Sequence, residues 1–277
     1  MPHYSASTGV NLYYEDTGGG GPAVVLFPST GLSLDVWNIH PVPDLRDRYR
    51  VITFDPRGIG RSKAPDAFLT IEQMAVDVAD LLHHLGIDQA HLVGHSVGGR
   101  IALSLTLTYP GLARSLVMAA SGSGSAIRAG EDVYPAIPHK ILVDLVTKGL
   151  EAHVRREVFA SDTFFTQEFR ARNVDWLSDF FDVYWRRHAD LGWYLRHLTA
   201  RHIFEATHLL GHVAAPTLVL IGSADMGGTT PHFPASQTMA ERIPNAELIV
   251  LDGQTHGFFW QQPDTTASVL KQWFDRH

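Results

Sequence analysis

The alternation of short apolar runs with longer helical patterns is the feature that most constrains the fold of this chain. Runs with few polar interruptions stand at 23–27, 50–54, 91–93, 115–119, 217–221 and 248–251. Short runs of this kind are typical of parallel strands that are buried on both faces. Because helical patterns separate the runs, the sequence predicts a doubly wound α/β sheet.

The clearest helical pattern begins at Thr70 and stops at Gly86. Thr70 and Gln73 have the spacing of a capping box, and apolar residues then recur every three to four positions. Similar patterns predict further helices at 101–109, 235–243 and 265–274. Two β-rich segments near the N-terminus, at 4–7 and 10–14, predict an edge hairpin.

The alternation stops between about residues 121 and 212. This interval has no convincing strand pattern but has many helical stretches rich in aromatic residues. We therefore predict an α/β core formed by residues 1–121 and 213–277, with residues 122–212 inserted as a helical cap. Most cap aromatic residues are expected to pack against the core, and a minority to line a pocket.

The overall composition narrows the classes of partner. The length of 277 residues suits one catalytic domain with an inserted subdomain. The formal net charge of -7, without a Lys/Arg run, argues against a nucleic-acid partner, which needs a clustered basic surface. The first residues lack a signal-peptide pattern, and no stretch approaches the roughly 18 apolar residues of a membrane span. We expect a soluble, cytoplasmic protein without a membrane partner.

The sequence contains no cysteine, which excludes disulfides, thiolate metal sites and a cysteine nucleophile. It has 16 histidines, but no HExxH motif or other recognised ligand spacing accompanies them. We therefore expect no catalytic metal. Any covalent catalysis has to use another side chain.

Ser96 lies between two glycines in the stretch Gly94-His95-Ser96-Val97-Gly98. Serines flanked by glycines are common in ordinary turns, where the hydroxyl bonds to nearby backbone. Here the stretch follows a predicted buried strand and precedes a helix. Such a sharp turn strains the serine backbone and requires small neighbours, so the context favours a nucleophile at the carboxyl end of the sheet.

A serine nucleophile needs a base to take its proton and an acid to orient that base. Asp225 follows the predicted strand 217–221, and His256 follows the strand ending at 251. The chain order Ser96, Asp225, His256 fits a Ser-His-Asp triad on an α/β sheet. Asp252 is the rival acid, but it lies four residues before the histidine and would have to fold back on the same turn.

On these residues, the chain resembles the α/β-hydrolase superfamily over essentially its whole length. Residues 94–98 match the nucleophile elbow, Asp225 the acid after the seventh strand, and His256 the histidine loop. Residues 55–62 (DPRGIGRS) match a further family signature, which we expect to shape the pocket floor without taking part in catalysis. The resemblance implies the α/β-hydrolase fold, a mostly parallel sheet flanked by helices with an inserted helical cap, and hydrolysis without a cofactor.

The mechanism also needs two N–H donors for the oxyanion. Val97, directly after the nucleophile at the start of a helix, is predicted to supply one. Many relatives carry His-Gly in the loop after Phe27, and the Pro-Ser pair at 28–29 here implies that Thr30 supplies the other. Residues 28–31 (PSTG) are also similar to a loop of 3-oxoadipate enol-lactonases, which implies ester or lactone hydrolysis.

Four aromatic residues lie next to the proposed oxyanion loop or histidine: Trp37, Phe258, Phe259 and Trp260. We predict that they line the substrate pocket, since such pockets are mostly apolar and aromatic. The substrate is accordingly expected to be a small to medium, largely apolar ester or lactone. Arg100 is expected to be exposed on the helix after the nucleophile, with binding of a substrate carboxylate as the alternative.

The primary prediction is a carboxylesterase or lactonase that forms an acyl-enzyme on Ser96. The same fold and triad also serve carbon–carbon bond hydrolases, lyases and cofactor-free oxygenases, which fold alone does not separate. A hydrolase-like receptor that binds a small molecule and changes its cap is a further alternative. The sequence leaves the substrate and the oligomeric state open.

Overall fold

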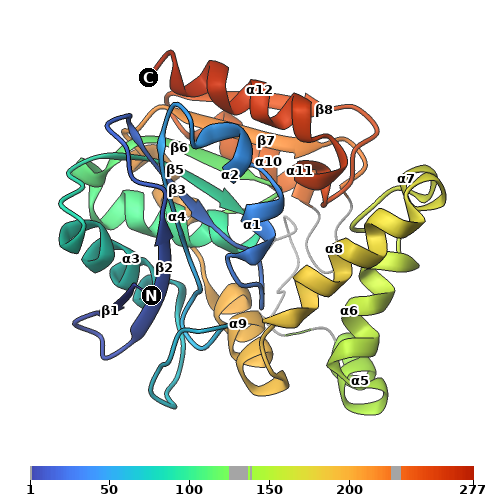
Figure 1. Cartoon of the computed structure of the whole chain (residues 1–277). Coiled ribbons are helices and arrows are strands. Elements are labelled where there is room, and N and C mark those ends of the chain that lie inside the picture. The colour runs from blue at the N-terminus through green and yellow to red at the C-terminus, as the bar shows by residue number, and fades with distance from the viewer. Residues whose placement is uncertain (1, 125–136, 138, 226–231) are drawn as a thin grey trace.

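The computed structural model describes residues 2–124, 137, 139–225 and 232–277, with an eight-stranded sheet at its centre (Figure 1). The strands are β1 (His3–Ser5), β2 (Asn11–Asp16), β3 (Ala23–Phe27), β4 (Arg50–Phe54), β5 (Ala90–His95), β6 (Ala113–Ala119), β7 (Thr217–Gly222) and β8 (Ala246–Leu251). Their order is β1-β2-β4-β3-β5-β6-β7-β8. β1 and β2 pair antiparallel at one edge, and all pairings from β4 to β8 are parallel. The predicted mostly parallel sheet is confirmed.

Helices cover both faces of this sheet (Figure 1). The helices of the alternating region are α1 (Asp35–Ile39), α2 (Val42–Leu45), α3 (Ile71–His84), α4 (Val97–Thr108), α10 (His232–Arg242), α11 (Phe258–Gln261) and α12 (Pro263–Phe274). A short 3-10 helix (Pro110–Leu112) follows α4. Within the described ranges, no helix is long and apolar enough to cross a membrane.

The strands divide their side chains between two apolar cores, because successive residues of a strand point to opposite faces. In β3, Val25 and Phe27 join the core formed with α3, α4 and α10. Val24 and Leu26 join the other core, to which α1, α2 and α12 contribute. Burial on both faces explains why the runs that form the central strands have so few polar residues.

Two sequence predictions about these elements are wrong in detail. The pattern at 101–109 covers only part of α4, which starts at Val97 as the oxyanion prediction assumed, because Gly98 and Gly99 weaken the helical pattern in its first turn. The run at 248–251 is not buried on both faces, since β8 is an edge strand that pairs with β7 alone. Its Leu248 and Val250 side chains are 38% and 41% exposed.

Between β6 and β7 the described chain is helical. The helices are α5 (His139–Lys148), α6 (Leu150–Phe159), α7 (Gln167–Arg172), α8 (Val174–Arg186) and α9 (Leu191–Ile203), followed by a 3-10 helix (Thr207–His212). Figure 1 shows α5 to α8 grouped beside the sheet, with α9 nearer the N-terminal elements. Residues 125–136 and 138 of the predicted cap lie outside the described part, and the cap boundaries at 122 and 212 stay a prediction.

Side chains of the family signature after β4 form buried polar contacts with neighbouring elements. The buried carboxylate of Asp55 accepts hydrogen bonds from the backbone N–H groups of Leu34 and Arg61, both at 2.8 Å. Arg57 forms a buried ion pair with Asp77 of α3 at 2.6 Å. These contacts tie the end of β4 to the loop after β3, which fits the structural role expected for the signature.

Replacing Thr70 tests the capping box of α3. Thr70 Oγ1 accepts from Gln73 N, and Gln73 Oε1 accepts from Thr70 N, both at 3.1 Å. Because Thr70→Ala removes the hydroxyl that accepts from Gln73 N, it should lower the free energy of unfolding by about 1 kcal/mol, measured by urea denaturation. The control Thr265→Ala, at an exposed position of α12, should change it by less than about 0.5 kcal/mol. Equal stability of the two variants would contradict the capping argument.

Candidate active site

Ser96 occupies the sharp turn between β5 and α4, where its backbone has φ +57° and ψ −120°. A residue with a side chain rarely adopts such angles, so the surroundings have to impose them. A Cβ on Gly94 would lie 2.4 Å from the carbonyl oxygen of Gly98, and a Cβ on Gly98 would lie 2.1 Å from that of Phe27. The turn therefore closes only because both neighbours are glycine.

Hydrogen bonds from the neighbouring strand hold the Ser96 backbone in this conformation. Its N–H donates to the carbonyl of Ala119 at the end of β6, at 2.9 Å. Its carbonyl accepts from Ser121 Oγ at 2.6 Å. The serine is thus fixed between β5 and β6 at the carboxyl end of the sheet, where open α/β folds bind their ligands.

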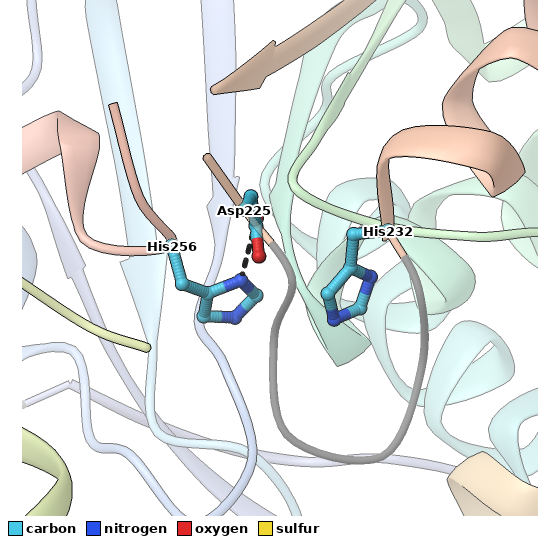
Figure 2. Close-up of side chains that lie close together, drawn as sticks. All are labelled: Asp225, His232 and His256. Carbon is cyan, nitrogen blue, oxygen red and sulfur yellow. Dashed lines mark hydrogen bonds and ion pairs between the residues drawn. The ribbon is translucent and has the colours of Figure 1, made fainter. Parts of the chain in front are cut away.

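Asp225 and His256 form a hydrogen-bonded pair (Figure 2). Asp225 follows β7 and is fully buried, and its Oδ2 lies 2.9 Å from His256 Nδ1. The carboxylate can only accept here, so His256 carries its proton on Nδ1 and leaves Nε2 able to accept another. Asp252 is exposed and accepts from Ser223 Oγ at 3.1 Å, which favours Asp225 over Asp252 as the orienting acid.

The His256 loop is held from two sides. From the helical region, the carbonyls of Thr163 and Phe164 accept from the N–H groups of His256 and Gly257, at 3.0 and 2.7 Å. From the nucleophile turn, His95 Nε2 donates to the carbonyl of His256 at 2.9 Å. Because burial lowers the pKa of His95 to about 3, this imidazole stays neutral and works as a fixed donor.

Ser96 and His256 border one cavity of about 550 Å³. The loop after β3 contributes Ser29 and Thr30, and the helical region contributes aromatic and charged side chains. The charged ones are Lys140, Asp144, Arg156, Glu157 and Arg201. The sequence did not predict these charged groups, which border the cavity beside its aromatic and aliphatic side chains.

No hydrogen bond joins Ser96 Oγ to His256 among the residues that the structure describes. Contacts of this kind are often long in enzymes without substrate and tighten when substrate binds. Ser96 and His256 therefore border one cavity without a hydrogen bond between their side chains.

The two predicted oxyanion donors lie on the helix that follows Ser96 and on the loop after β3. Val97 is the first residue of α4, so its N–H has no partner within the helix. Thr30 borders the cavity, and the loop that carries it is shaped by Gly31, with φ +73°. The carbonyl of Gly31 accepts from Ala189 N at 2.9 Å, so the helical region also holds this loop.

Comparison with known proteins shows to which family the chain belongs. A family model for the alpha/beta hydrolase fold matches residues 22–263. The chain belongs to this α/β-hydrolase family. The membership predicted from the sequence motifs is thereby confirmed, and the protein is a hydrolase by fold and family.

Individual relatives of this hydrolase differ in the reactions their names state. "Putative carbamate hydrolase RutD" of Azorhizobium caulinodans is 28% identical, over 98% of this chain and 97% of its own length. The enol-lactonase from Burkholderia xenovorans superposes with a TM-score of 0.84 at 23% identity, covering 99% and 100% of the two chains. The esterase EaEST from Exiguobacterium antarcticum gives 0.77 at 21% identity, covering 98% of each. At these identities the solved structures establish a shared fold alone.

The four aromatic residues predicted to line the pocket of the hydrolase do not border the cavity. Trp37, Phe258, Phe259 and Trp260 are buried behind it and surround the ring of His95, with centroid distances between 5.5 and 6.4 Å. α11 turns its residues into the core, so their nearness to His256 in sequence does not bring them to the substrate side. Instead, Phe164, Tyr184 and Tyr194 of the helical region border the cavity.

Most residues that border the cavity were not found from the sequence, and His232 and Arg201 are two examples. His232 begins α10, and its ring stacks on that of His256 with the centroids 4.8 Å apart. Arg201 lies in the last turn of α9. Neither stands in a motif, and only the fold brings them to the cavity that His256 borders. Arg100, expected to be exposed, is only 2% exposed and donates through Nη1 to the carbonyl of Arg201.

Asp225, His232 and His256 together form the type of cluster that could hold a metal. Their potential ligand atoms lie within 4.8 Å of one another, and Figure 2 shows the two imidazole rings on either side of the carboxylate. However, a cation bound by Asp225 and His256 would compete with the hydrogen bond that fixes the imidazole. The geometry therefore suits proton transfer better than metal binding.

Buried histidines should make the stability of this hydrolase sensitive to acid. Burial lowers the pKa of His232 to about 3 and that of His197 to about 4, below the value of about 6.5 in an unfolded chain. Between these values the unfolded state binds more protons, so the free energy of unfolding should fall as the pH decreases from 6.5 toward 4. Urea denaturation at pH 7, 6 and 5 measures this fall.

His197→Gln provides the matched comparison. His197 Nε2 donates to the carbonyl of Arg57 at 3.0 Å, and a glutamine amide keeps a donor without titrating. Its stability should decline less steeply than that of the wild type, by up to about 1.4 kcal/mol per pH unit. Parallel curves for the two proteins would refute this account of His197.

Proposed function

We propose that the protein is a serine carboxylesterase or lactonase that works through an acyl-enzyme. The observation that carries this proposal is the Asp225–His256 pair at the cavity bordered by the strained Ser96. A serine at a sharp turn after a buried strand, beside an imidazole held by a carboxylate, is the arrangement that acyl transfer requires. Membership of the α/β-hydrolase family supports it.

In the proposed reaction, Ser96 Oγ attacks the substrate carbonyl while His256 Nε2 takes the hydroxyl proton. Asp225 keeps the imidazole in the required tautomer and stabilises the imidazolium. The N–H groups of Val97 and Thr30 bind the oxyanion, helped by the positive N-terminus of α4. His256 then protonates the leaving oxygen, and later deprotonates the water that releases the acyl group. No step needs a cofactor.

The cavity bounds the size of the substrate. About 550 Å³ lies within the usual range for small-molecule sites, so a small to medium ester or lactone fits. Its charged and hydroxyl-bearing lining favours a substrate with polar groups besides the reacting carbonyl, since burying such side chains against an apolar ligand is unfavourable.

Replacing Ser96 tests the nucleophile. Ser96→Ala removes the attacking oxygen, so turnover of p-nitrophenyl acetate should fall by at least about 1,000-fold. Release of p-nitrophenol measures the rate, and an unchanged thermal unfolding midpoint confirms that the variant folds. Turnover within a few-fold of the wild type would overturn the mechanism.

The two candidate acids provide a matched pair of variants. Asp225→Asn should lower kcat by about 1,000- to 10,000-fold, because the amide no longer holds His256 in the required tautomer. Asp252→Asn, in the loop after β8, should change kcat by less than about threefold, since that exposed side chain accepts from Ser223 Oγ. A large loss in the Asp252 variant with activity retained in the Asp225 variant would reverse the assignment.

Carbamate hydrolysis is the second candidate, favoured by the relative named RutD. A carbamate carbonyl can be attacked by the same serine, and the products then include an amine and carbon dioxide. Identification of the products separates this reaction from ester hydrolysis. The same product analysis tests carbon–carbon bond cleavage, elimination and oxygenation, which the shared fold leaves as alternatives.

A further inference from the structure

His232 is a buried imidazole beside the candidate base that takes no part in the reaction described so far. It is only 4% exposed, and it borders the cavity together with Ser96 and His256. Its ring stacks on that of His256, with the centroids 4.8 Å apart (Figure 2). The other imidazole in contact with His256 is His95, whose Nε2 already donates to the carbonyl of His256. His232 is therefore the neighbouring ring that has a nitrogen to offer to a ligand.

Burial keeps the ring of His232 neutral. It lowers the pKa of His232 to about 3, although the carboxylate of Asp225 favours the charged form. Near neutral pH the ring therefore carries one proton, and its two nitrogens are one donor and one acceptor. As a much weaker base than an ordinary histidine, this ring does not compete with His256 for the proton of the serine.

The surroundings of the ring decide which nitrogen carries that proton. Nδ1 of His232 is buried and has no hydrogen-bond partner in the part of the chain that the structure describes. A proton on Nδ1 would be a buried N–H without an acceptor, which native structures rarely contain. The proton therefore belongs on Nε2, the nitrogen that can face the cavity which His232 borders.

The spacing of the two rings suits two hydrogen bonds to one oxygen atom. A ring nitrogen of His232 lies within 4.8 Å of a ring nitrogen of His256. Two hydrogen bonds of about 2.9 Å that meet at an oxygen at the tetrahedral angle span about 4.7 Å between their nitrogens. An oxygen that exchanges a proton with His256 Nε2 can therefore also accept a hydrogen bond from His232 Nε2.

Two oxygens take this position in turn during acyl transfer. During acylation it is the leaving oxygen of the ester, which receives its proton from His256. During deacylation it is the oxygen of the attacking water, which gives its proton to His256. Negative charge develops on the leaving oxygen as its bond to the carbonyl carbon breaks, so a fixed donor beside it stabilises the transition state.

We propose that His232 is a further catalytic residue, whose Nε2–H donates a hydrogen bond to the oxygen that leaves during acylation and enters during deacylation. This inference rests on the proposed function and adds a residue to the same site. His232 keeps its proton throughout, because His256 protonates the leaving oxygen and later deprotonates the water. The hydrogen bond matters most for a strongly basic leaving oxygen, on which more charge has to be stabilised.

The test compares two acetates that form the same acetyl-enzyme. p-Nitrophenyl acetate releases a weakly basic phenolate, whereas p-nitrobenzyl acetate, longer by one CH₂ group, releases a strongly basic alkoxide. His232→Phe keeps a ring beside His256 but removes the donor. It should lower kcat/KM for p-nitrobenzyl acetate about 10- to 100-fold, as expected for a lost hydrogen bond to a charged oxygen, and that for p-nitrophenyl acetate by less than about threefold. Acid release at constant pH measures both rates.

Deacylation gives a second measurement on the same variant. Because water takes the place of the leaving oxygen, His232→Phe should lower kcat for p-nitrophenyl acetate about 10-fold, while kcat/KM, which reports acylation, changes by less than about threefold. The acetyl group should then accumulate on Ser96, which intact-protein mass spectrometry detects. A role of His232 in packing alone would lower both kinetic parameters together.

Further variants show whether the hydrogen bond causes these changes. His232→Gln keeps an N–H donor on a side chain of similar reach, so it should recover most of the kcat/KM for p-nitrobenzyl acetate. His208→Phe makes the same exchange at an exposed histidine outside the described lining of the cavity and should leave all rates unchanged. If the thermal unfolding midpoint shows that His232→Phe does not fold, His232→Met takes its place, since it also lacks an N–H donor.

Two results with a folded variant would overturn the role of His232: an equal loss of kcat/KM with both acetates, or unchanged rates with both. If Ser96→Ala abolishes hydrolysis of the acetates in either case, the proposed function stands and only the role of His232 fails. If the wild type hydrolyses neither acetate, or if Ser96→Ala retains turnover, the proposed function fails and the role of His232 fails with it.

Discussion

The close approach of backbone around Ser96 is the constraint on which the rest of the site depends. Gly94 packs against the first turn of α4, and Gly98 packs against the carbonyl of Phe27. The second contact brings the loop after β3 next to the nucleophile, which is how Thr30 comes to border the same cavity. A side chain at either glycine would separate the serine from the groups that are to act on its substrate, so the turn fixes the positions of all of them.

The helical region between β6 and β7 forms hydrogen bonds with the candidate catalytic loops, and its side chains border the cavity. The carbonyls of Thr163 and Phe164 hold the His256 loop, and Ala189 donates to Gly31 in the loop that carries Thr30. The region that contributes side chains to the cavity therefore also holds the backbone of the His256 loop and of the loop that carries Thr30.

The hydrophobic period of short segments predicted the strands and helices of the sheet domain. The turn residues around Ser96, and the positions of Asp225 and His256 after later strands, predicted the candidate triad. They did not predict which side chains border the cavity. Trp37 and Trp260 are adjacent to the candidate site in sequence but pack around His95, whereas Arg201 and His232 come from two helices that only the folded chain brings together. The sequence did not predict the burial of Arg100 for the same reason, since the carbonyl that it binds lies 101 residues further along the chain.

Burial determines the charge state of the histidines that surround His256. His95 and His232 both contact the ring of His256, with centroids 4.7 and 4.8 Å away. Burial holds the pKa of each at about 3, so near neutral pH neither carries a charge that would repel an imidazolium at His256. His256 is in turn hydrogen-bonded to the carboxylate of Asp225. Asp225 thus orients one of three neighbouring imidazole rings, while burial keeps the other two neutral.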